Sequence, residues 1–171
     1  MKRLTLLRHA KSSWDEPDAD DFDRPLNDRG WKAARRMGKA LKHRKIHFDV
    51  AIASTAARVR ETLDGLEETY GDFLFPVHFD QRVYLASSDE LLRIVRALPA
   101  DAERALIVGH NPGLERLAIT LTADDDDLRH KVEEGLPTAA LVEIELPVDQ
   151  WIEVGPGDGT VEELILPREL D

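Results

Sequence analysis

The stretch KRLTLLRH at residues 2–9 runs through apolar and β-branched side chains and ends in an arginine and a histidine. A short apolar run of this kind is typical of a buried strand, so we expect a strand over residues 2–7. This strand would deliver Arg8 and His9 at its carboxyl end. In open α/β sheets, sites form beyond the carboxyl ends of the strands. The pair is therefore the first candidate for chemistry in this chain.

Beyond this stretch, segments with strand-like and helix-like patterns alternate. Short apolar runs predict further strands over residues 49–53, 76–79 and 105–108. Between and after them, apolar side chains recur at helical spacing. These sets are Trp31, Ala34, Met37 and Leu41 after the N-cap Asn27; Val59, Leu63, Leu66 and Tyr70; Leu91, Leu92, Val95 and Leu98; and Leu114, Leu117, Ala118 and Leu121. The alternation predicts an α/β fold, a three-layer sandwich with a mostly parallel central sheet flanked by helices.

The last third of the chain has fewer signals. Residues 139–146 alternate well enough for a strand, and we expect Trp151 to Val154 to pair with it. The glycines and proline of residues 155–159 predict a turn between late strands. Asp124 to Asp127 lack the spacing of a calcium loop, so we interpret them as a solvated turn.

Length and composition limit the classes of protein. The chain has 171 residues, 42% hydrophobic and 33% charged, with no repeat or linker, and we expect a single domain over residues 1–171. It contains no cysteine, which excludes disulfides, thiolate metal sites and cysteine nucleophiles. No apolar run approaches the ~20 residues of a membrane helix, and the N-terminus lacks a signal-peptide cleavage site, so we expect a cytoplasmic protein. The net charge of −11 disfavours nucleic acid and anionic membranes as partners.

Three predicted strand ends carry groups that suit phosphate chemistry. The first gives Arg8 and His9, the second gives Ser54 with Arg58 one turn into the next helix, and the third gives His110. If these strands are neighbours, two guanidiniums and two imidazoles meet in one cleft. The planar fork of arginine matches phosphate oxygens and stays charged at any relevant pH. The pattern predicts a phosphate site.

The two histidines indicate more than binding. A neutral imidazole is a competent nucleophile and can carry a phosphoryl group as a covalent intermediate. A second imidazole can donate a hydrogen bond to the phosphoryl oxygens in the transition state. The arginines would supply the positive charge that magnesium supplies elsewhere, so we expect no metal or other cofactor.

Four segments make this sequence recognisable: LRHAKSSW at 7–14, PLNDRG at 25–30, STAARVRET at 54–62 and VGHNP at 108–112. Together and in this order they resemble the histidine phosphatase superfamily, also called phosphoglycerate mutase-like. The short length and the Gly-His-Asn-Pro form resemble its SixA-type phosphohistidine phosphatases.

The resemblance implies a role for each matching residue. His9 would be the nucleophile, and Arg8, Arg58 and His110 would hold the phosphoryl group. Two further residues are expected near the phosphate, Ser12 and Asn111. The chain departs from the family pattern at Thr55, where a proline is usual, and at Asp15, where mutase-like members often have an asparagine.

The larger departure from the family pattern concerns the general acid. Many members place a glutamate before the third helix to protonate the leaving oxygen, and residues 82–90 hold no carboxylate where one is needed. Asp89 and Glu90 are expected in the first turn of the helix instead. In the loop after His9, the residues Asp15, Asp18 and Asp23 could reach the cleft. The sequence gives no reason to choose any one of them as the general acid. A nitrogen leaving group is readily protonated from solvent, so the missing acid favours phosphohistidine, or another substrate with a good leaving group.

These observations predict a metal-independent phosphatase that acts through a phosphohistidine intermediate on His9. Its substrate would be a phosphohistidine in a partner protein or a small phosphorylated compound. A phosphoglycerate-type mutase is disfavoured by the length and by the missing acid. The alternative from another class is a phosphate-binding or regulatory module without turnover. The sequence leaves the oligomeric state open.

Overall fold

The computed structural model describes residues 1–170. Their helices and strands follow in the order β1 (Lys2–Arg8), α1 (Asp28–His43), β2 (Val50–Ala53), α2 (Ala57–Tyr70), β3 (Val77–Phe79), α3 (Ser88–Arg96), β4 (Arg104–Gly109), α4 (Gly113–Leu121), α5 (Asp127–Glu133), β5 (Leu141–Leu146) and β6 (Thr160–Ile165). Short 3-10 turns are η1 (Asp21–Asp23), η2 (Gln81–Val83), η3 (Trp151–Glu153) and η4 (Pro167–Glu169).

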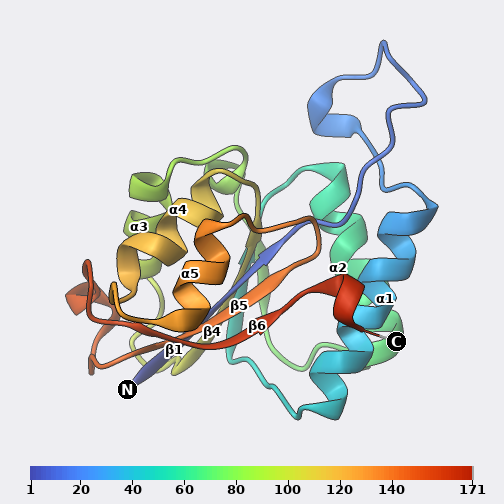
Figure 1. The fold of residues 1–171 in the computed structure, drawn as a ribbon. Coiled ribbons are helices and arrows are strands. Elements are labelled where there is room, and N and C mark those ends of the chain that lie inside the picture. The colour runs from blue at the N-terminus through green and yellow to red at the C-terminus, as the bar shows by residue number, and fades with distance from the viewer. Residues whose placement is uncertain (171) are drawn as a thin grey trace.

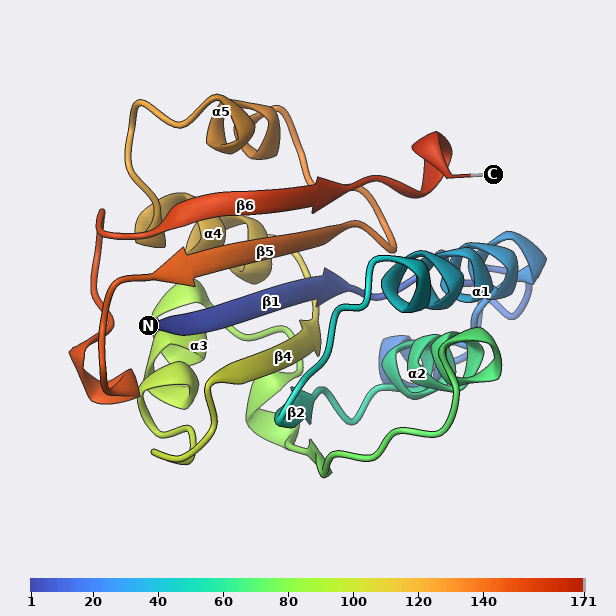
Figure 2. The ribbon, with the colours of Figure 1, turned by 90° about the horizontal axis from the view of Figure 1, so that it is seen from below.

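The strands form one six-stranded sheet in the order β3-β2-β4-β1-β5-β6. β1 runs parallel to β4, and β2 runs parallel to both β4 and β3. β5 is antiparallel to its neighbours β1 and β6. Helices α1 and α2 cover one face of the sheet, and α3, α4 and α5 cover the other (Figures 1 and 2). The predicted three-layer α/β sandwich with a mostly parallel sheet is confirmed.

Each face of the sheet has its own apolar core, and β1 contributes to both. Leu4 and Leu6 pack into the cluster beneath α3 and α4, whereas Leu7 packs into the cluster beneath α1 and α2. Successive strand residues point to opposite faces, which explains the division. Since the strand is buried on both sides, its sequence is a continuous apolar run rather than an alternating one.

The start of α1 fixes the segment after His9. The side chain of Asn27 caps the helix, because its oxygen accepts a hydrogen bond of 2.8 Å from the Gly30 amide. The backbone N–H of Asn27 in turn donates to the carbonyl of Lys11 at 3.0 Å. A Cβ on Gly30 would lie only 2.1 Å from that same carbonyl oxygen. Glycine at this position therefore allows the chain after His9 to lie directly against α1.

The expected strand over Trp151–Val154 is wrong. These residues contain the 3-10 turn η3, and the strand that pairs with β5 is β6, Thr160–Ile165. Trp151 is buried and its indole N–H donates to the carbonyl of Ala102 at 2.7 Å. The indole is thus an anchor for the connection between β5 and β6. A buried aromatic side chain gives the same apolar signal in a turn as in a strand, which explains the wrong prediction.

The acidic run is a turn only in its first half. Asp124 and Asp125 lie in an exposed turn, as expected, but Asp127 begins α5. Asp126 is the N-cap of that helix and accepts hydrogen bonds from the amides of Leu128 and Arg129. Within residues 1–170, no helix is long and apolar enough to cross a membrane.

Candidate active site

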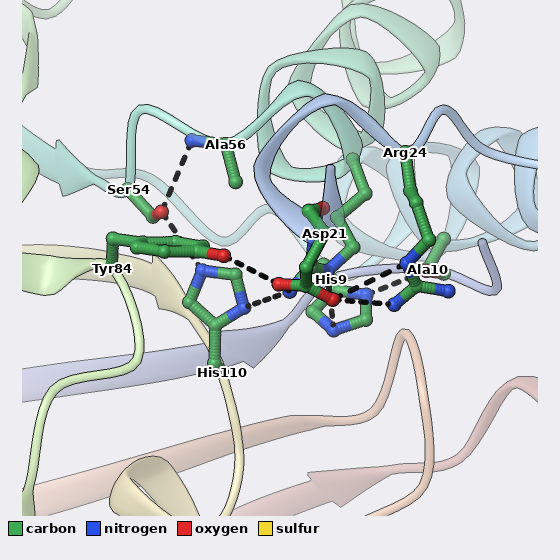
Figure 3. A network of polar contacts seen from close by, with 9 residues as sticks. His9, Ala10, Asp21, Arg24, Ser54, Ala56, Tyr84 and His110 are labelled. Carbon is green, nitrogen blue, oxygen red and sulfur yellow. Dashed lines mark hydrogen bonds and ion pairs between the residues drawn. The ribbon is translucent and has the colours of Figure 1, made fainter. Parts of the chain in front are cut away.

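The three strands that were expected to deliver functional groups are neighbours in the sheet. β2, β4 and β1 lie side by side, and parallel strands end at the same edge. His9 follows β1, Ser54 follows β2 and His110 follows β4, so all three meet at this edge (Figure 3). Arg58, in the first turn of α2, reaches the same place.

The guanidinium of Arg58 lies between the two imidazoles. Its Nε is 3.4 Å from Nε2 of His9, and its Nη2 is 3.3 Å from Nδ1 of His110. The ring centroids of the two histidines are 5.2 Å apart. The exposed fractions of His9, Arg58 and His110 are 7%, 3% and 3%. The structure thus joins these three predicted residues in one buried cluster.

A backbone hydrogen bond fixes which nitrogen of His9 is free. Nδ1 lies 2.7 Å from the carbonyl oxygen of Ala10, which only accepts, so Nδ1 carries the proton. The lone pair then lies on Nε2, the atom that faces Arg58. Burial is the main cause that lowers the pKa of His9 to about 4, and the positive charges of Arg58 and Arg8 act in the same direction. At neutral pH the ring is therefore an uncharged base.

His110 is held in the other tautomer. Arg58 can only donate, so Nδ1 of His110 accepts, and Nε2 donates to the Ser54 hydroxyl at 2.8 Å. The Ser54 oxygen also accepts from the amide of Ala56 at 3.2 Å. Burial, followed by the charge of Arg58, lowers the pKa of His110 to about 3. The second imidazole is therefore also neutral and rigidly oriented.

Arg8 is anchored to the loop before β5 and keeps a donor free. Its Nη1 donates to the carbonyl of Leu136 at 3.0 Å, and its buried Nε has no hydrogen-bond partner among the described residues. A buried donor without a partner costs free energy, unless a ligand accepts the bond. Burial lowers the pKa of Arg8, and the nearby Glu115 acts in the opposite direction. The guanidinium of Arg8 can therefore bind an anion.

Ser12 and Asn111 are not part of the polar cluster around Arg58. Ser12 is buried and forms an isolated bridge with Leu26 through its backbone. The side-chain amide of Asn111 donates to the carbonyl of Leu136 at 2.8 Å, and the same carbonyl accepts the hydrogen bond from Arg8. Asn111 thus supports the loop that holds Arg8, and a direct contact of either residue with phosphate stays a prediction.

Sequence reasoning missed one residue of the cluster, Asp21. It belongs to η1, in the loop between β1 and α1 that folds back over the site (Figure 3). Its Oδ2 accepts from Nη2 of Arg58 at 3.0 Å and from the hydroxyl of Tyr84 at 2.5 Å. Its backbone carbonyl accepts from Nη1 of Arg58 at 2.7 Å. On the other side, Oδ1 pairs with Nη2 of Arg24 at 3.1 Å.

These donors keep Asp21 ionised. Burial opposes ionisation, but the hydrogen bonds from Tyr84 and Arg58 and the charges of Arg58 and Arg24 outweigh it and lower the pKa of Asp21 to about 2. The sequence around Asp21 gives no signal that selects this residue, although its neighbour Phe22 is an aromatic side chain in a mostly polar loop. Phe22 packs edge-on against Tyr84 with a centroid distance of 5.1 Å, which brings Asp21 to the site.

Acidic side chains near the site do not gather into a metal cage. Among residues 1–170, no group of three or more His, Asp or Glu side chains is placed to hold a metal ion. Asp15, Asp18 and Asp23, the loop aspartates that the sequence offered as candidate acids, make no hydrogen bond or ion pair with Arg58 or with either histidine of the cluster among the described residues.

Comparison with known proteins identifies relatives of this chain. The family model of the histidine phosphatase superfamily (branch 1) matches residues 4–84. An uncharacterized protein of Mycobacterium leprae is 31% identical over 140 residues, which cover 79% of this chain and 84% of that protein.

Two solved structures are similar over nearly their whole length, and both are provisionally named phosphohistidine phosphatase SixA. The protein from Nakamurella has a TM-score of 0.84 and 25% identity, with 97% of this chain and 96% of that chain covered. The protein from Agrobacterium tumefaciens has a TM-score of 0.80 and 27% identity, with 97% and 98% covered.

Proposed function

Because this chain belongs to the histidine phosphatase superfamily and is of the SixA type, we propose that it is a metal-independent phosphatase that carries the phosphoryl group on Nε2 of His9. The observation that carries the proposal is the tautomer of His9. The hydrogen bond to the Ala10 carbonyl leaves the lone pair on Nε2, and that atom lies beside the buried guanidinium of Arg58. A nucleophile and an anion-binding group therefore share one small space.

In the first step, the phosphoryl oxygens accept hydrogen bonds from Arg58 and from the free Nε of Arg8. Nε2 of His9 attacks phosphorus, and the bond between phosphorus and the leaving atom breaks with its electron pair. In the second step, water attacks the phosphohistidine and inorganic phosphate leaves. Charge stabilisation by positioned guanidiniums is the main catalytic contribution in phosphoryl transfer.

His110 changes its role when substrate arrives. In the free protein its Nδ1 accepts a hydrogen bond from Arg58. When the phosphoryl oxygens take the donors of Arg58, their negative charge next to His110 raises the pKa of that ring. The protonated ring then donates through Nδ1 to a phosphoryl oxygen, while the Ser54 hydroxyl holds Nε2 in place.

We favour phosphohistidine in a protein as the substrate, with a small phosphorylated compound as the second possibility. Asp89 and Glu90 lie in the first turn of α3, where they complement the helix dipole, and the described residues 82–90 place no carboxylate in contact with the cluster. The name of the two SixA relatives points in the same direction. A leaving nitrogen tolerates the lack of a general acid better than a leaving oxygen.

The test compares wild type with His9→Ala, and uses His78→Ala, which changes an exposed histidine in β3, as the matched control. A phosphohistidine-bearing protein and an aryl phosphate are each supplied with a chelator and without added metal, and an acid quench detects labelled enzyme. We expect His9→Ala to lose at least about 10³-fold in turnover, and to form no acid-labile phosphoenzyme. Phosphate binding by wild type without any turnover would instead favour the regulatory binding module.

A further inference from the structure

Asp21 lies where the leaving group of a substrate must pass. The nucleophile and its two partners, Arg58 and His110, are almost completely buried, whereas the side chain of Asp21 is 45% exposed and contacts Arg58 from the solvent side. In an in-line displacement, the leaving atom departs on the side of phosphorus opposite to the nucleophile. Because His9 is buried, we take that side to be the one towards solvent, where the partly exposed side chain of Asp21 accepts a hydrogen bond from Tyr84 (Figure 3).

Asp21 presents a fixed negative charge at this mouth. Its two carboxylate oxygens are held by three side chains, Arg58, Arg24 and Tyr84. Arg24 itself is held, because its guanidinium lies 3.6 Å from the ring centroid of Trp14. When Arg58 turns its donors to the phosphoryl group, one acceptor position on Oδ2 becomes free. The site therefore offers a preorganised acceptor next to the departing group.

We propose that Asp21 selects the leaving group: its carboxylate accepts a hydrogen bond from the ring N–H of a phosphoimidazolium, so that phosphohistidine is cleaved in preference to phosphate esters. This inference rests on the proposed function, since it concerns the substrate of the same site. It assigns a specificity role to a residue that sequence reasoning did not select.

The chemistry of the two leaving groups explains the preference. In a phosphoimidazolium the ring nitrogen that is not phosphorylated already carries a proton. When Nε2 of His9 forms its bond to phosphorus, the P–N electron pair returns to the ring, which leaves as neutral imidazole without further proton transfer. An ester oxygen leaves as an anion unless an acid protonates it. Asp21 holds no proton at neutral pH, so it cannot act as that acid, and its charge repels an anionic leaving group.

The experiment measures kcat/KM for phosphoimidazole and for an aryl phosphate with the same enzyme preparations. The variants are Asp21→Asn, which removes the charge at constant shape, and Asp21→Glu, which keeps it. Asp23→Asn is the matched control, because Asp23 is exposed in the same 3-10 turn and makes no side-chain hydrogen bond among the described residues.

We expect Asp21→Asn to lower the ratio of the two kcat/KM values, phosphoimidazole over aryl phosphate, about tenfold, which corresponds to ~1.4 kcal/mol. Asp21→Glu should recover part of the ratio, and Asp23→Asn should keep the ratio of wild type. An equal loss on both substrates in Asp21→Asn would overturn the inference, because it would show that Asp21 only holds Arg58 in place. Failure of the proposed function is distinguishable, because wild type would then cleave neither compound and form no phosphoenzyme.

Discussion

His9 and His110 are close neighbours of arginine side chains, and both remain uncharged at neutral pH because they are buried. An ordinary histidine has a pKa near 6.5, whereas here the pKa is about 4 for His9 and about 3 for His110. Burial thus keeps His9, the proposed nucleophile, in the form with a free lone pair. In the proposed complex with substrate, the phosphoryl charge would instead favour a protonated His110.

This leads to a prediction for the two rings. Lowering the pH from 7 to 5.5 should leave both imidazoles neutral, because a group with a lowered pKa gains its proton only near that lower value. NMR spectra of protein with ¹⁵N-labelled histidine would show His9 protonated at Nδ1 and His110 at Nε2 across this range. A titration of either ring close to pH 6.5 would contradict the buried geometry.

At the scale of single residues, the sequence selected residues of the candidate site that lie near strand ends and did not select Asp21, which arrives from a loop. Arg8, His9, Arg58 and His110 were found because each stands at or shortly after the end of an apolar run. Asp21 is one of six acidic residues between positions 15 and 23, and no periodicity separates it from the others. Only its tertiary contact with Arg58 does so, and that contact depends on how the whole loop folds back.

Among the elements, α1 supports the candidate site, because its N-terminus holds the segment after His9. We predict that Asn27→Ala lowers the free energy of unfolding by about 1 kcal/mol, since it removes the acceptor for the Gly30 amide. Urea unfolding would measure the change. Asn27→Ser retains a capping oxygen and should lose less than Asn27→Ala. Equal losses in the two variants would show that capping is not the stabilising contribution.

The predictability of the strands depended on how apolar their sequences are. β1, β2 and β4 are interior strands with apolar sequences, and each was predicted within a residue or two. β6 was missed, because its sequence TVEELI includes two exposed or half-exposed glutamates, whereas β3, the other edge strand, has the sequence VHF and was predicted. Charged side chains on an edge strand protect it from pairing with other chains, and they also weaken the apolar signal.

At the scale of the whole molecule, the buried histidines couple the site to stability. The folded pKa values of His9 and His110 lie below the unfolded value of about 6.5, so the unfolded chain takes up protons first as the pH falls. The stabilising contribution of neutral burial is therefore complete above pH 6.5 and is lost as the pH falls towards 4. The same burial that prepares the nucleophile thus makes the fold sensitive to acid.

We predict that His110→Asn reduces this sensitivity. Between pH 7 and pH 5, the free energy of unfolding of wild type should fall by about 2 kcal/mol more than that of His110→Asn. The comparison uses urea unfolding at both pH values and concerns the pH dependence rather than the absolute stability, which the substitution also changes. Parallel pH profiles for the two proteins would show that His110 is not buried in its neutral form.

The contact between Asp21 and Arg58 also governs the site when it holds no substrate. A free inorganic phosphate ion must displace a carboxylate that is already bound to the same guanidinium, and it brings no leaving group that could make up for the lost ion pair. The chain thus contains its own competitor against the product of its reaction. We expect an enzyme built in this way to release phosphate readily and to keep turning over in surroundings that are rich in that ion.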